Sequence, residues 1–261
     1  LISASLASVA VLSAGAEILG NDTEAGMSPD VVVLTSSSGR RAVLVGTAHV
    51  SLDDAELVRR VILREMPSCV VVELDPSRLP RLNLTEADVP QMFVPPSALE
   101  GAVGNWATDA LAGWLRSLLT SAYDSLSSQG LKAGGDFVAA IEAAQHVGAE
   151  RITFADVKSE ETIAKLIQAL GEVGFVDFLM RYTRLAAGFA EDLASFVAED
   201  GVPDMNPASL IPQVKRWWRS TPDASRRLKC ELPEFYDVVV HSRDSRLSVA
   251  VSDYLCDAGT T

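Results

Sequence analysis

The sequence predicts an α/β protein with a central mixed sheet, a βαβ unit and a large helical portion in its second half. In the first half, β-branched and apolar runs at residues 31–34, 42–45 and 69–72 indicate strands. A helical period separates the second run from the third, which is the pattern of a βαβ unit. From residue 160 onward, apolar side chains recur at helical spacing for some 40 residues.

The composition limits the class of partner and the chemistry of the cysteines. With 22 basic and 35 acidic residues, the net charge is −13, which argues against nucleic acid as the main partner because phosphate binding needs a positive field. The three cysteines, Cys69, Cys230 and Cys256, are far apart, and the sequence contains no Cys-x-x-Cys. A zinc ribbon and a thioredoxin-type site are therefore not expected, and a reducing, intracellular compartment is the simplest assumption.

Residues 1–28 are predicted to form an N-terminal tail or a residual targeting segment, and residues 29–261 the main domain. The first 20 residues are apolar and rich in small side chains, but Glu17 interrupts them and no basic residue precedes it. A loosely packed helix or tail is favoured over a targeting peptide or anchor. Residues 21–30 are polar and turn-rich, which is typical of a linker.

The first elements of the domain have clear boundaries. The runs at 31–34 and 42–45 flank a Ser/Gly turn, which predicts a hairpin. A helix follows, with Ser51 and Asp53 as capping candidates, and Pro67 ends it. The continuous apolar run "CVVVELD" then indicates a strand that is buried on both faces, reached by a right-handed crossover.

The remaining elements follow from proline and glycine positions and from helical spacing. They are an irregular segment at 76–100, a helix with an apolar face at 107–118, a helix at 135–147, a short strand ending at Asp156, helices over 160–200 and a last helix at 233–255. Gly171 and Gly174 predict a break within the stretch from 160 to 200. The aromatic side chains of that stretch indicate core packing rather than a cofactor site.

Polar side chains follow three of the predicted strands. His49 lies just after the first parallel strand, Glu73 ends the second and Asp156 follows the third. Ligands of open α/β sheets bind outside the carboxyl ends of the strands, so these side chains are expected to converge on one edge. An imidazole and two carboxylates there can bind a divalent metal or act as an acid/base pair.

A structural reading of the same residues stays open. The turn at Gly46 and the dipole of the helix after Ser51 favour an anionic ligand and a neutral imidazole. Alternatively, Thr-Ala-His is only a capped turn, and the sole role of Glu73 is to form an ion pair with Arg78. Motifs for nucleotide hydrolysis, dinucleotide binding, zinc-dependent proteolysis and the α/β-hydrolase reaction do not occur in the sequence.

Two further features are assigned to packing or surface roles. His146 lies on an amphipathic helix, where a surface or packing histidine is favoured. The basic segment around Trp217 and Trp218 is compatible with an anionic membrane surface, but a solvated helix face with two buried indoles is favoured.

Several blocks in one order resemble the TraB/PrgY-like family, which includes the eukaryotic TraB domain-containing proteins. The blocks are "VGTAHVS", "VVVELDPSRL", "GGDF" and the late "SRD", and the resemblance covers about residues 29–255. The first block is highly specific. The later ones are weaker singly, but their order adds weight.

The resemblance implies a relation to the Tiki-type and erythromycin-esterase-like superfamily and a metal-dependent hydrolytic site. In that site, a Gly-x-x-His motif, matched here by Gly46 and His49, acts with a glutamate, matched by Glu73. Arg78 belongs to the same block as Glu73. Bacterial relatives are linked to shutdown of peptide pheromones. Eukaryotic members are associated with the mitochondrial outer membrane and with membrane contacts between organelles.

The sequence departs from the family pattern near its C-terminus. Arg243 and Asp244 match a late Glu-Arg-Asp signature, but Ser242 stands in the glutamate position. A second Gly-x-x-His and a C-terminal membrane segment, both expected after that signature, do not occur before Thr261. Either the chain is truncated, or the function here does not need the second histidine. In a metal site, His241, Asp156 or Asp244 would have to complete the ligand set.

Two functional hypotheses result. In the first, His49 ligates a divalent metal, and Glu73 is a ligand or a general base on a metal-bound water that hydrolyses a peptide or protein substrate. In the second, the chain is a non-enzymatic regulatory or membrane-contact protein of the mitochondrial outer membrane or another organelle, bound to that membrane through missing segments. His49 and Glu73 then only stabilise the sheet edge. Anion binding at the N-terminus of the helix at 51–65 is a weaker third alternative.

Overall fold

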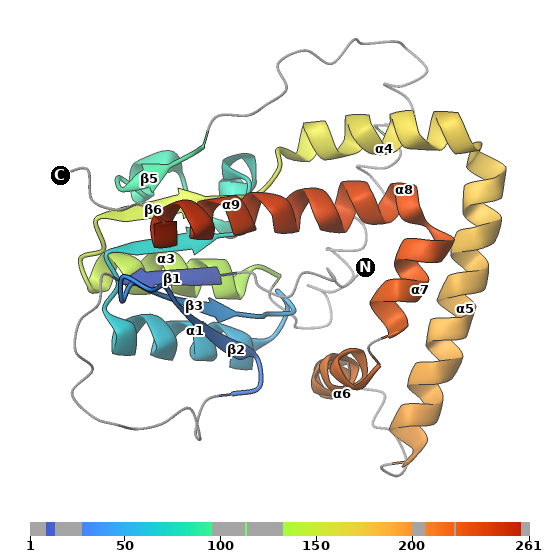
Figure 1. Cartoon of the computed structure of the whole chain (residues 1–261), viewed down its shortest axis with the longest axis horizontal. Helices are drawn as coiled ribbons and strands as arrows, with labels where there is room; N and C mark the ends of the chain where they lie inside the picture. The colour runs from blue at the N-terminus through green and yellow to red at the C-terminus, as the bar shows by residue number, and fades with distance from the viewer. Residues whose placement is uncertain are drawn as a thin grey trace. The chain divides into compact units, whose positions relative to one another are not determined.

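The fold is described from a computed structural model, for residues 9–13, 28–95, 113, 133–199, 207–221 and 223–256 (Figure 1). The chain divides into two compact units. The sheet unit consists of Ser5–Ala98, Lys132–Ser159 and Arg243–Thr261, and the helical unit of Leu1–Ala4, Leu99–Leu131 and Glu160–Ser242. Apart from residue 113, the helix predicted at residues 107–118 lies outside the described residues.

The sheet unit contains a six-stranded mixed sheet in the order β2-β3-β1-β4-β6-β5, which confirms the predicted fold class. Its strands are β1 (Val9–Ser13), β2 (Val31–Thr35), β3 (Arg41–Val45), β4 (Cys69–Val72), β5 (Met92–Phe93) and β6 (Arg151–Phe154). The strands β2 and β3 form the predicted antiparallel hairpin. The pairs β4–β6 and β5–β6 are parallel. Two short 3-10 helices, Pro76–Leu82 and Glu86–Asp88, interrupt the segment that was expected to be irregular.

The first strand differs from the sequence prediction. Residues 9–13, assigned above to a tail or a loose helix, form β1, which lies between β3 and β4 and is antiparallel to both. The physical reason is burial on two faces, because Val9, Ala10, Val11 and Leu12 have no exposed surface. A strand covered on both sides shows no polar alternation, and its small side chains resemble those of a targeting segment.

The register of the sheet aligns the carboxyl ends of three strands. Val9 of β1 pairs with both Val45 of β3 and Val72 of β4, so β3 and β4 are parallel to each other with β1 between them. Val72 in turn pairs with Phe154 of β6. The loops that follow β3, β4 and β6 therefore leave the sheet at the same edge. Helix α1 (Leu52–Glu65) connects β3 to β4, so the predicted βαβ unit is present with one strand inserted.

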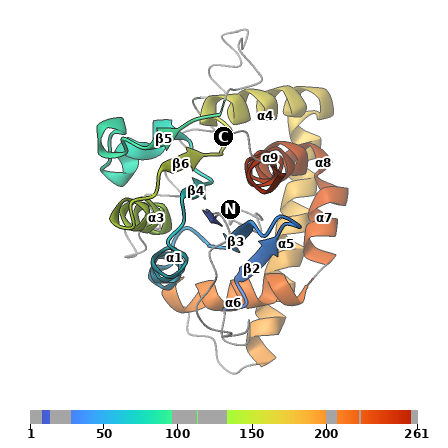
Figure 2. The same ribbon diagram turned by 60° about the vertical axis from the view of Figure 1, so that its left-hand side comes forward.

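Each face of the sheet is covered by helices of the sheet unit. Helices α1 and α3 (Gly135–His146) lie on one side and α9 (Ser242–Cys256) on the other (Figure 2). Alternate residues of β1 lie on opposite faces of the sheet. Val9 and Val11 belong to the core between the sheet and helices α1 and α3. Ala10 and Leu12 belong to the core between the sheet and α9. The sheet is thus the middle layer of three, as burial of both its faces requires.

The helical unit confirms the helical second half of the chain. Its elements are α4 (Ser159–Val173), α5 (Phe175–Glu199), α6 (Pro207–Ser220), α7 (Asp223–Glu231), α8 (Pro233–Tyr236) and a π-helical turn at Asp237–His241. The predicted break falls at Gly174, whose φ of 90° ends α4 because only glycine adopts that backbone angle without strain.

The aromatic side chains of the helical unit pack against one another. The ring of Trp217 lies 5.6 Å from that of Phe189 and 5.9 Å from that of Trp218. Trp217 is buried but Trp218 is only partly buried, so one of the two indoles that were predicted to be buried is buried. Among the described helices, none has the length and the apolar character needed to cross a membrane.

The central place of β1 predicts a large cost for truncating Leu12. Leu12→Ala removes a fully buried side chain between the sheet and α9, and we expect it to lower the free energy of unfolding by about 2–5 kcal/mol. Leu52→Ala is the matched control, because Leu52 is 69% exposed, and we expect a change within about 0.5 kcal/mol. Denaturant unfolding measures both. Equal costs for the two variants would contradict the position of β1 in the sheet.

Candidate functional site

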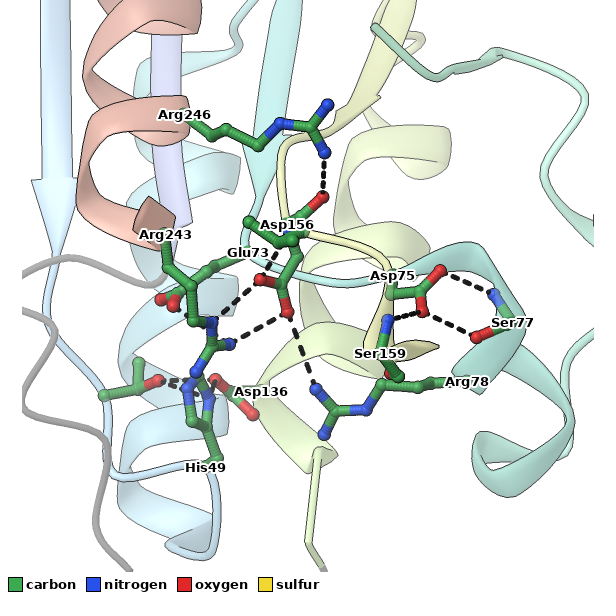
Figure 3. A network of polar contacts seen from close by, with 12 residues as sticks. His49, Glu73, Asp75, Ser77, Arg78, Asp136, Asp156, Ser159, Arg243 and Arg246 are labelled. Atoms are coloured by element: carbon green, nitrogen blue, oxygen red, sulfur yellow. Dashed lines mark hydrogen bonds and ion pairs between the residues drawn. The ribbon is translucent and has the colours of Figure 1, made fainter. Parts of the chain in front are cut away.

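The candidate site lies where β3, β4 and β6 end. The loop after β3 carries His49, β4 is followed by Glu73, and β6 by Asp156. Two helices begin at the same place and add Asp136 from α3 and Arg243 from α9 (Figure 3). All of these residues belong to the sheet unit.

The loop after β3 is held at both of its ends. The side chain of Ser51 caps α1 by accepting the N–H of Asp54, as predicted, at 3.3 Å. Asp54 rather than Asp53 completes the turn, because its carboxylate accepts the N–H of Ala48 at 2.7 Å. His49 itself has a φ of 59°, and its carbonyl accepts the N–H of Gly134 at 2.6 Å. A left-handed backbone at a non-glycine residue is uncommon and points to a functional constraint.

The ring of His49 is fixed by Asp136, Thr47 and Phe137. Its Nδ1 lies 2.9 Å from Oδ2 of Asp136, and the hydroxyl of Thr47 donates to the same oxygen at 2.5 Å. The ring of Phe137 stacks on the imidazole, with the two centroids 4.6 Å apart. Asp136 is 1% exposed, so the pair lies in a setting where hydrogen bonds to a charged group are strong.

The charge of Asp136 determines which nitrogen of His49 carries the proton. Burial alone raises the pKa of Asp136, but the attraction of His49 and the hydrogen bonds from His49 and Thr47 outweigh it and hold the pKa below its ordinary value. An ionised carboxylate only accepts hydrogen bonds, so Nδ1 must carry the hydrogen. In the neutral ring, Nε2 then has the free lone pair. That atom is buried and has no hydrogen-bond partner among the residues that the structure describes.

Glu73 and Asp156 share one guanidinium. Arg243 binds Asp156 with two nitrogens, Nε to Oδ1 at 2.8 Å and Nη2 to Oδ2 at 2.9 Å. Its Nη2 also lies 2.9 Å from Oε1 of Glu73. Glu73 has no exposed surface and the side chain of Asp156 is 5% exposed, so both carboxylates are buried beside the same cation.

Two more arginines approach Asp156. Nη1 of Arg246, one turn further along α9, donates to the backbone carbonyl of Asp156 at 2.8 Å. Nη1 of Arg78, in the 3-10 helix after β4, lies 3.8 Å from Oδ2 of Asp156. Glu73 thus pairs with Arg243, and Arg78 approaches Asp156.

Asp75 joins the segment after β4 to the start of α4. Its carboxylate accepts the N–H of Ser77 at 3.1 Å, the hydroxyl of Ser77 at 2.6 Å and the N–H of Ser159 at 2.8 Å (Figure 3). Burial raises the pKa of Asp75, but these hydrogen bonds from Ser77 and Ser159 outweigh it and keep the pKa below its ordinary value. The interaction is structural, because every contact is to a neighbouring backbone or hydroxyl group.

The predicted metal ligands, His49, Glu73 and Asp156, do not fit a metal ion in the arrangement that they adopt. Both oxygens of Asp156 are bound by Arg243, which also approaches Glu73, so a positive group already lies between the two carboxylates. Over the described ranges, no three side chains of His, Cys, Asp or Glu are gathered to hold a metal. A divalent metal at this site stays a prediction.

Other predicted residues have smaller parts. Gly46 donates its N–H to the carbonyl of Asp30 at 2.8 Å, next to the Val31–Val45 pair that ends the β2–β3 hairpin. His241 is exposed in the π-helical turn and is assigned to the helical unit, and Asp244 is partly buried in α9. His146 is exposed at the end of α3, as the surface reading predicted.

Sequence reasoning missed Asp136 and Thr47. The signal was present in "GGDF", because a helix that leads into a parallel strand begins at the carboxyl edge of the sheet. An aspartate in its first turn therefore faces the same edge as His49. Gly134 has a φ of 80°, which lets α3 begin close to the His49 loop.

A buried histidine–aspartate pair beside an arginine-bridged pair of carboxylates, all at the carboxyl edge of a mixed sheet, defines an α/β domain with a polar site of its own. A model of the TraB/PrgY/gumN family matches residues 31–261, nearly the whole chain, so this protein belongs to that family. No curated protein and no solved structure gave a match. The wider relation to the Tiki-type superfamily stays a prediction, and β1 lies outside the matched residues.

The hydrogen bonds of Asp75 predict a pH-dependent stability. Asp75→Asn replaces an acceptor with a group that donates, so we expect a loss of about 1–3 kcal/mol at neutral pH. Because the folded pKa lies below 3.8, this contribution is complete above pH 3.8 and is lost as the pH falls through the folded pKa. Denaturant unfolding at several pH values measures it, with Asp253→Asn, an exposed position, as control. A cost that stays constant down to the most acidic pH would contradict the assignment.

Proposed function

We propose that this TraB-family domain is a hydrolase for peptide or protein substrates in which His49 is the general base. One observation carries the proposal: Nε2 of His49 is buried and has no hydrogen-bond partner among the described residues, while Nδ1 is held by Asp136. Leaving a buried polar atom unpaired costs about 1–3 kcal/mol, so an atom of this kind needs an explanation, and a catalytic role is one.

The contacts of His49 are those that a general base requires. Asp136 keeps the hydrogen on Nδ1, so the lone pair of Nε2 is directed to take a proton from a water molecule. As that water attacks a carbonyl carbon, the imidazole becomes an imidazolium, and the buried charge of Asp136 stabilises it. When the tetrahedral intermediate collapses, the C–N bond breaks and the imidazolium returns its proton to the leaving amine, which regenerates the neutral base. The left-handed backbone of His49 and the ring of Phe137 restrict the imidazole to this orientation.

The peptide substrate and the metal come from the family resemblance. Shutdown of a peptide pheromone by bacterial relatives favours a peptide as substrate. The divalent metal predicted at His49, Glu73 and Asp156 is not needed for the base proposed above, and no step is assigned to it. A metal would have to compete with Arg243 for both carboxylates.

The second candidate function is a non-enzymatic one, and a specific observation favours it. Arg243 pairs with both Glu73 and Asp156 and fastens the start of α9 to the segments that follow β4 and β6. A purely structural network has this form. In that case the chain is a regulatory or membrane-contact protein at an organelle such as the mitochondrial outer membrane, and His49 only stabilises the sheet edge.

Replacement of the base separates these functions. The wild type and the variants His49→Gln, Asp136→Asn and His146→Gln are incubated with a pool of synthetic peptides, and cleavage is read by mass spectrometry. We expect His49→Gln to lower kcat/KM by about 10²–10⁴-fold, and Asp136→Asn to lower it and to change the pH profile. His146 is exposed, so His146→Gln keeps the wild-type rate.

The outcomes of this experiment are distinct. Cleavage by the wild type that persists in folded His49→Gln would contradict the base assignment. If the wild type cleaves no peptide and His49→Gln is only less stable, the non-enzymatic function is supported. Circular dichroism of each variant confirms that it is folded.

A further inference from the structure

The resident cation of the site is Arg243. Its guanidinium lies between two carboxylates that follow the adjacent strands β4 and β6, with Asp156 bound through two nitrogens and Glu73 at 2.9 Å from one of them (Figure 3). Guanidinium is always charged in proteins and matches a carboxylate with two parallel hydrogen bonds. The position between the carboxylates is thus filled by a group that does not lose its charge.

Burial makes a cation necessary at this place. Glu73 has no exposed surface, the side chain of Asp156 is 5% exposed and that of Arg243 is 14% exposed. Two buried carboxylates beside each other repel, and removing one from water without a partner is costly. A divalent metal would need the carboxylate oxygens that Arg243 already binds, so either the metal or the guanidinium occupies the site.

The packing of α9 holds Arg243 in position. Leu247 and Val251 follow Arg243 at intervals of four residues, so all three lie on one face of the helix. Both apolar side chains are buried in the core between α9 and the sheet. Arg246 adds its hydrogen bond to the carbonyl of Asp156. Moving Arg243 out of the site would disturb these contacts as well.

We propose that Arg243 takes the place of the metal ion in this protein. The Glu73–Asp156 pair then binds no divalent metal in the wild type, and removal of the guanidinium converts the pair into a site that does. This inference rests on the arginine bridge and not on hydrolysis, so it can hold or fail independently of the function proposed for His49.

Metal binding to arginine variants tests the proposal. The wild type, Arg243→Met, Arg243→Lys and Arg246→Met are dialysed with Zn²⁺ or Mn²⁺, and bound metal is counted by elemental analysis and by calorimetric titration. We expect Arg243→Met to bind one equivalent per chain and to gain thermal stability when metal is added. The wild type and Arg246→Met bind none. Arg243→Lys keeps a positive charge, and we expect it to bind none either.

Two results would overturn the proposal. The first is one equivalent of metal in the wild type that is lost in Glu73→Gln. The second is a folded Arg243→Met that binds no more metal than Arg246→Met does. If Arg243→Met does not fold without metal, recovery of its circular dichroism on adding Zn²⁺ supports the proposal, and metal bound by the wild type still overturns it.

Discussion

The site depends on the interaction of Arg243 with Glu73 and Asp156. The two carboxylates end adjacent strands and are buried, so each would cost several kcal/mol without a partner. One guanidinium, from a helix 87 residues further along the chain than Asp156, supplies that partner. The stability of the carboxyl edge of the sheet therefore depends on α9, which packs on the face that contains Ala10 and Leu12.

The same edge holds a second polar pair with a different property. In the His49–Asp136 pair, the carboxylate is matched by the ring and by Thr47, but Nε2 of the ring keeps an unused lone pair. Oδ1 of Asp136 also lacks a hydrogen-bond partner among the described residues, so Nε2 is not the single unpaired polar atom at this edge.

The predictable part of the protein is the part governed by local pattern. Strands β2, β3, β4 and β6 and helix α1 follow from β-branched runs, helical spacing and capping by Ser51, and their order predicts that His49, Glu73 and Asp156 lie at one edge. Strand β5 was missed, because it lies in the segment 76–100 that was predicted to be irregular. The place of β1 was not predictable in this way, because a strand of small apolar residues in the middle of a sheet has no polar face. The partners of His49 and Asp156 could not be predicted from local pattern either, because Asp136 and Arg243 each lie 87 residues away in the sequence.

The arginine bridge also bears on which residue can act as a base. The family resemblance offered Glu73 either as a metal ligand or as a general base. A glutamate whose oxygen lies 2.9 Å from a guanidinium nitrogen has that oxygen directed at a cation, not at a water molecule. Nε2 of His49 has no hydrogen-bond partner among the described residues, and Asp136 orients the ring through its contact with Nδ1. Under the function proposed above, proton transfer falls to His49, and Glu73 pairs with Arg243.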